Sequence, residues 1–148
     1  MADPRETILA QLVVIAQGVD GVVSAVRNAV DAPNIERPTF LIHDGAETFL
    51  SKPISERRSR VQLIELTPQI VILAAASPVD LGTLLNSFRA RFLSAVLADA
   101  VLLSVIPLTG DGEIRYEGCT FEPSGAESRE GRMELHFVFT YVFRASDL

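Results

Sequence analysis

The sequence has 148 residues, a length typical of one domain, which we expect to span residues 1–148. Hydrophobic residues make up 48% of the chain and charged residues 22%, a composition that excludes a wholly disordered protein. The formal net charge of −6 argues against a general nucleic-acid-binding protein, because contacts to phosphates need a basic surface.

The first predicted element is a helix over residues 4–17. Asp3 is placed to cap its free N–H groups, and Glu6 would complete a capping box. Gly18 is expected to end the helix. The charged residues before and within its first turn lack the basic start and apolar run of a signal peptide, so we expect no secretory leader. Apolar residues recur at helical spacing: Ile8, Leu9, Leu12, Ile15 and Ala16.

Two short strands are predicted next, over residues 22–28 and 38–44, because both segments are rich in β-branched or aromatic residues. Residues 29–37 lie between them and are predicted to form a loop. The polar residues 45–59, interrupted by Pro53, are predicted to form a second, longer loop.

A third strand is predicted over residues 60–75, with an irregularity at Pro68. Proline has no N–H to donate to a neighbouring strand, so we expect a bulge, a bend or an edge position there. The strand overlaps the longest apolar run, residues 70–76. That run is far shorter than the ~20 residues that span a membrane.

A second helix is predicted from Pro78 to about residue 98. Ser77 is expected to cap it, and Asp80 suits the positive end of the helix. Asp99 would cap a short continuation through Val105. A broad apolar stripe follows the helix: Leu81, Leu84, Leu85, Phe88, Phe92, Leu93, Val96 and Leu97.

Two further strands are predicted, over residues 113–122 and 132–143. The second alternates strictly, so its two sets of side chains belong on opposite faces of the sheet. One set is large and apolar: Met133, Leu135, Phe137, Phe139, Tyr141 and Phe143. The other is mixed: Glu134, His136, Val138, Thr140 and Val142.

The order of these elements predicts an α+β fold. Clustered strands joined by short turns favour a mainly antiparallel sheet of about five strands, with two helices packed on one face. The aromatic row of residues 133–143 would lie beneath the helices. The opposite face would be half polar, and in an assembly it could line a channel or contact a neighbour.

Few residues are candidates for chemistry. Cys119, His43 and His136 are the obvious nucleophile or base candidates, but no catalytic signature surrounds them. The single cysteine rules out an intramolecular disulfide and fits a reducing compartment. We expect a strand residue at Cys119, a sheet-surface residue at His136, and a turn at Asp44-Gly45.

The sequence predicts neither a metal site nor a cofactor site. It has no cysteine pair, no histidine pair at ligand spacing and no glycine-rich phosphate loop. Asp111 and Glu113 flank a glycine, but the other ligands of a calcium loop are missing. We therefore expect no enzyme activity and no cofactor.

One basic cluster stands out in this acidic chain: Lys52, Arg57, Arg58 and Arg60. It is either a solvated loop or a segment that becomes ordered against an acidic neighbouring subunit. Acidic turns near Glu127 and Glu130 would be the complementary patch on that neighbour. These six residues are the predicted subunit or partner interface.

Several segments, in this order, resemble tail terminator (tail completion) proteins of long-tailed bacteriophages and phage-like particles. The similar segments are Val22–Asn28, the proline-led strand that ends in Asp44-Gly45, Leu81–Asn86 with Arg89–Arg91, Gly112–Gly118 and Phe137–Phe143. Together they cover most of the chain. None contains a chemical signature, so the resemblance depends on their joint order.

The resemblance implies a structural virion protein of the tail or neck, assembled in the host cytoplasm. Members of the family form hexameric rings that cap the head-proximal end of the tail tube and stop its elongation. The ring also provides the docking surface for the head–tail connector or neck protein. DNA passes through the lumen without specific binding, and neither a cofactor nor a membrane is involved.

Three other functions remain open at this stage. The chain could be another neck or head–tail joining protein, which would also form a ring. It could be a small-ligand-binding α+β domain, marked by a deep apolar pocket with converging polar groups. An enzyme that uses His43 and Asp44 is the remaining alternative.

Overall fold

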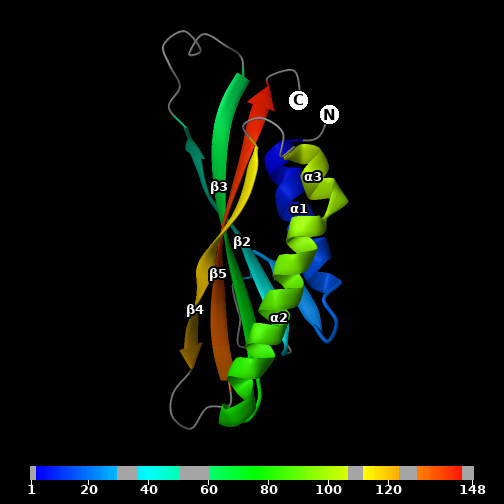
Figure 1. Ribbon diagram of the computed structural model, residues 1–148, viewed down its shortest axis with the longest axis vertical. Helices are drawn as coiled ribbons and strands as arrows, with labels where there is room; N and C mark the ends of the chain where they lie inside the picture. The colour runs from blue at the N-terminus through cyan, green and yellow to red at the C-terminus, as the bar shows by residue number, and fades with distance from the viewer. Residues whose placement is uncertain (1–2, 30–36, 51–60, 107–111, 124–129, 145–148) are drawn as a thin grey trace.

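The computed structural model describes residues 3–29, 37–50, 61–106, 112–123 and 130–144. Within these residues the chain forms three helices and five strands, which confirms the predicted α+β fold (Figure 1). In chain order they are α1 (Pro4–Gln17), β1 (Ser24–Arg27), β2 (Thr39–Phe49), β3 (Val61–Ala75), α2 (Pro78–Ala98), α3 (Ala100–Val105), β4 (Glu113–Pro123) and β5 (Glu130–Arg144). The turns predicted around residues 30–36, 107–111 and 124–129 lie outside this description.

The sheet is mainly antiparallel, as predicted, with strand order β1-β2-β3-β5-β4. Its one parallel pair among the described strands is β1 with β2, in which Ser24 faces Thr39. β3 and β5 form its long centre and pair from Val61 opposite Arg144 to Ala75 opposite Glu130. β1 and β4 are therefore the two edges.

β2 is longer than predicted. It continues to Phe49, so residues 45–49 belong to a strand and not to the predicted loop, and Asp44-Gly45 lies at a bulge within the strand and not in the predicted turn. The strand can continue because a bulge interrupts its register: His43 faces Gln69, and the next paired residue, Ala46, faces Thr67. Pro68 lies at this irregularity, which confirms the bulge expected from its missing N–H.

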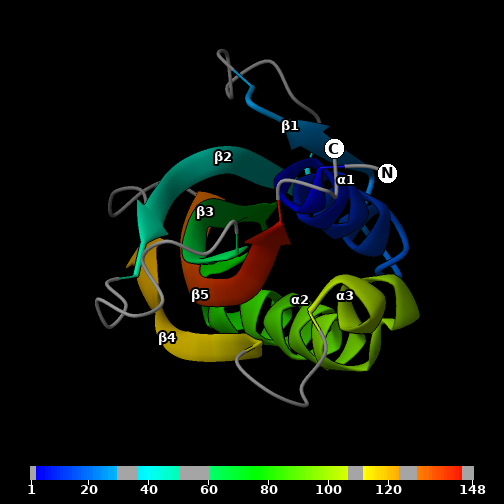
Figure 2. The ribbon, with the colours of Figure 1, turned by 90° about the horizontal axis from the view of Figure 1, so that it is seen from above.

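The helices all pack on one face of the curved sheet (Figure 2). The predicted aromatic row of β5 lies beneath them. Phe92 of α2 contacts two sheet residues, with ring centres 5.0 Å from Phe40 and 6.1 Å from Phe137. Burial of each such ring stabilises the fold by about 1.5–3 kcal/mol, so the aromatic row accounts for much of the attachment of the helices. The row is buried at Met133, Leu135, Phe137, Phe139 and Tyr141, and partly buried at Phe143.

The predicted caps at Asp3, Gly18 and Asp99 are confirmed, Ser77 is the N-cap residue of α2 without a side-chain capping bond, and the capping box at Glu6 is wrong. The carboxylate of Asp3 accepts the N–H of Arg5 at 3.0 Å, and that of Asp99 accepts the N–H of Leu102 at 2.9 Å. Ser77 precedes α2, but its hydroxyl bonds Asp80 and no backbone N–H. The capping box expected at Glu6 does not form, because this carboxylate binds the Arg27 guanidinium.

Candidate functional site

The structure places one of the six predicted interface residues. Glu130 opens β5, its side chain is 54% exposed, and its carboxylate lies 3.7 Å from Nε of Arg37 in the same chain. The other five lie outside the described residues: Lys52, Arg57, Arg58, Arg60 and Glu127. The pairing of the basic cluster with acidic turns stays a prediction.

The structure separates the residues considered for chemistry. Cys119 is an exposed residue of β4, as predicted, and faces Leu135 in the strand register. His136 lies on β5 between Gly118 and Gln69. His43 and Asp44 are not joined as a catalytic pair, because the Asp44 carboxylate is bound by Arg27 and Asn28. No group of three or more metal-ligating side chains occurs among the residues described.

The sheet face opposite the helices carries paired charges with an acidic excess. On β4, Arg115 lies 3.3 Å from Glu113 and 3.5 Å from Glu117. Arg132 on β5 lies 3.6 Å from Glu122 and 3.4 Å from Glu134. Each arginine is thus flanked by two carboxylates, which leaves a net negative charge on this face. These pairs are partly exposed, and salt screens them.

The two sheet edges differ. β1 has four residues and is parallel to its neighbour, whereas β4 has eleven and is antiparallel. β4 also has a bulge between Tyr116 and Gly118, where Gly118 has a φ of +117°. Within the described residues each of these two strands pairs on one side only, so they form the edges of the sheet.

A network centred on Arg27 ties α1 to β1 and β2. Its guanidinium donates to Asp44 at 2.7 and 2.9 Å and to Glu6 at 2.7 and 3.0 Å. These hydrogen bonds lower the pKa of both carboxyls, and they raise the pKa of Arg27. Asn28 exchanges two further bonds of 3.0 Å with Asp44.

A second polar contact reaches the buried core. Glu47 of β2 accepts the hydroxyl of Tyr141 at 3.0 Å and a guanidinium N–H of Arg5 at 3.0 Å. Burial, followed by the bond to Glu47, raises the pKa of the Tyr141 phenol. Both networks hold α1 on the sheet, so we assign them a structural role.

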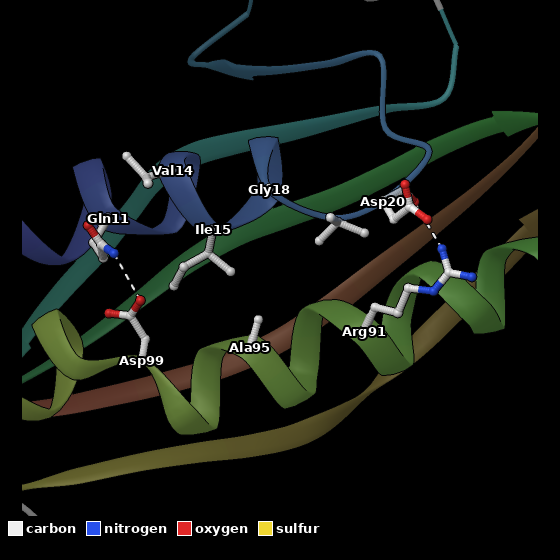
Figure 3. A pocket seen from close by; sticks show the side chains of 9 residues that line it. Gln11, Val14, Ile15, Gly18, Asp20, Arg91, Ala95 and Asp99 are labelled. Carbon is white, nitrogen blue, oxygen red and sulfur yellow. Dashed lines mark hydrogen bonds between the residues drawn. The ribbon is translucent and has the colours of Figure 1, made fainter.

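A groove of about 430 Å³ runs between α1 and α2 (Figure 3). One end is bounded by a 2.9 Å hydrogen bond from Gln11 to Asp99. At the other end Arg91 donates to the backbone carbonyl of Asp20 at 2.9 Å. The residues that line it are Gln11, Val14, Ile15, Gly18, Val19, Asp20, Arg91, Ala95 and Asp99. Sequence analysis did not find this groove, because a gap between two helices depends on how they pack.

Comparison with known proteins gives no relative from which to assign a role. A scan against protein-family models finds no match, and a search of curated proteins finds none. The helices that the structure describes include none with the length and apolar character needed to cross a membrane.

Proposed function

We propose that this chain is a tail terminator of a long-tailed bacteriophage or phage-like particle. It forms a hexameric ring on the head-proximal end of the tail tube, stops tube elongation and docks the head connector. The observation that carries the proposal is the difference between the two sheet edges, β1 and β4. A closed ring needs two unlike, complementary surfaces on every subunit, and in this proposal the two unlike edges of the sheet take that role.

The charge of the helix-free face supports the same function. Its arginines, Arg115 and Arg132, are each outnumbered by carboxylates. If this face lines the lumen, DNA meets a wall that repels its phosphates and releases no counterions on contact. DNA would then slide through the ring without being held. The docking and tube contacts would lie on the two rims.

The α1–α2 groove favours the ligand-binding alternative, because its volume falls within the ~300–1,000 Å³ of small-molecule sites. Its polar end groups argue against that function. Gln11 and Asp99 bond each other, and Arg91 bonds a backbone carbonyl, so these groups already have partners. They are not arranged as free groups that converge on a ligand.

The mass in solution and the appearance of purified tails test the proposal. We expect a particle of six times the single-chain mass, with an open centre in negative-stain images, and overlong tails when the gene is removed. Tails of normal length that fail to join heads would instead identify a joining protein. A chain that stays monomeric at high concentration would contradict both ring functions.

A further inference from the structure

The groove between α1 and α2 has features of an unfilled contact surface. Val14 lies on its rim and is 55% exposed, although most other apolar residues of α1 are buried. The Asp20 side chain accepts no hydrogen bond from the residues described, since Arg91 bonds the backbone carbonyl of Asp20 instead. An apolar wall and an available carboxylate are thus placed side by side.

The charge of the groove is complementary to one segment of this chain. Two carboxylates, Asp20 and Asp99, line it against the single guanidinium of Arg91. Residues 52–60 contain four basic residues and one acidic residue, and they also carry Ile54, an apolar side chain suited to the wall. In a chain of net charge −6, this segment is the strongest local concentration of positive charge.

The occupant belongs to another copy. Figure 1 places the end of β2 and the start of β3, which flank residues 52–60, at the end of the molecule where α1 begins, whereas the groove lies along the second half of α1. A groove on one subunit and a segment on its neighbour form a heterologous contact, which repeats around a ring.

We infer that the α1–α2 groove receives residues 52–60 of a neighbouring copy of this chain. The basic side chains of the segment contact Asp20, in place of the acidic turns near Glu127 and Glu130 that the sequence predicts, and Ile54 packs against Val14. The contact rests on the proposed ring and adds to the contact between sheet edges that closes it.

Charge reversal on each side tests the contact. The groove variant is Asp20→Lys, and the segment variant carries Arg57→Glu and Arg58→Glu together. The control is Asp80→Lys, at the end of α2 away from the groove, which changes the charge by the same amount as Asp20→Lys. Sedimentation should show assembly weakened about tenfold by either reversal, restored when the two are combined, and unchanged in the control. Thermal unfolding of each variant verifies that it is folded.

A second measurement isolates the groove from the ring. A dye-labelled peptide of residues 50–62 is titrated into the Arg57→Glu, Arg58→Glu chain, whose groove should be free. We expect binding that weakens about tenfold when Asp20→Lys is added.

The two measurements separate the possible failures. A wild-type ring that tolerates all the reversals overturns the groove contact and leaves the proposed function standing. A monomeric wild-type chain overturns the ring, and the peptide titration then decides the groove by itself. Absence of peptide binding, or a small molecule found in the groove, overturns the inference.

Discussion

Gly45 lies against Pro68 across the bulge of β2, and a Cβ atom on Gly45 would come within 2.8 Å of the Pro68 Cα. Gly45 also has a φ of +71°, a conformation that side chains disfavour. Pro68 has no N–H to donate to β2. Gly45 allows β2 to form a bulge at this position, where two residues of β2 lie opposite one residue of β3. Pro68 and Gly45 together allow β2 and β3 to stay paired on both sides of the irregularity.

Replacing Gly45 with alanine should therefore be strongly destabilising. We expect Gly45→Ala to lower the free energy of unfolding by about 2–4 kcal/mol, since the new Cβ adds both a clash and backbone strain. Urea unfolding measures the change. Gly82 is the matched control, because it lies within α2 and a Cβ there would contact nothing within 4 Å. Gly82→Ala should raise the free energy of unfolding by about 0.5–1 kcal/mol, and equal effects at the two positions would contradict the argument.

The ion pair of Arg27 with Asp44 should make a measurable contribution to stability. The side chains are 28% and 30% exposed and joined by two hydrogen bonds. A double-mutant cycle with Arg27→Gln and Asp44→Asn should give a coupling energy of about 1 kcal/mol, reduced by salt. The same cycle on Arg115 and Glu117, 3.5 Å apart and more exposed, should give a value near zero. A larger coupling at that pair than at Arg27 would refute this ranking.

Acid should weaken the fold through the carboxyls that Arg27 binds. The pKa values of Asp44 and Glu6 are lowered in the folded chain, chiefly by their hydrogen bonds to Arg27. The stability they contribute is complete above the ordinary carboxyl pKa of about 4 and is lost as the pH falls through the lowered values. Urea unfolding between about pH 6 and pH 2 should show a steeper loss for the wild type than for Arg27→Gln. Parallel curves would show that these pairs are not responsible.

Both tyrosines should titrate late in the folded protein. Burial is the largest cause that raises the pKa of Tyr116 and of Tyr141, and the bond to Glu47 adds to the effect at Tyr141. Because the folded pKa values are raised, the stability is present below the ordinary tyrosine pKa of about 10 and is lost as the pH rises through the folded values. Ultraviolet absorbance of tyrosinate should show that the tyrosines of the folded chain lose their protons at a higher pH than the tyrosines of the chain unfolded in urea. Tyr141→Phe should remove one of the two steps, and coincident native and unfolded curves would contradict the prediction.

Periodicity predicted the fold well where one physical rule dominated. The alternation of residues 132–143 specified the helix-facing side of β5, although Val138 and Thr140 on the other side are also buried, and the cap at Asp99 marked the start of α3. Local rules failed where a distant partner decided the outcome. The polarity of residues 45–49 indicated a loop, but pairing with β3 makes them a strand. Glu6 had the position of a capping residue, yet Arg27, distant in sequence, binds it.

The surfaces were harder to predict than the fold. Charge alone singled out the basic segment of residues 52–60 in the sequence. The groove depends on the spacing of two helices, and the contact of Arg132 with Glu122 depends on strand register. Neither is written in a local pattern. The sequence shows which segment is basic, but only the packed structure shows where acidic side chains lie on the surface.

The long pairing of β3 with β5, interrupted at Thr67 and Pro68, determines how the chain responds to mechanical force. These strands are antiparallel neighbours over most of their fifteen residues each, and their hydrogen bonds run perpendicular to them. Tension along the strands loads many of those bonds in shear at the same time, so no single bond carries the load. Force applied across the sheet opens bonds in succession from an edge. The folded chain is therefore stiff along its strands and weakest to peeling of the edge strands β1 or β4.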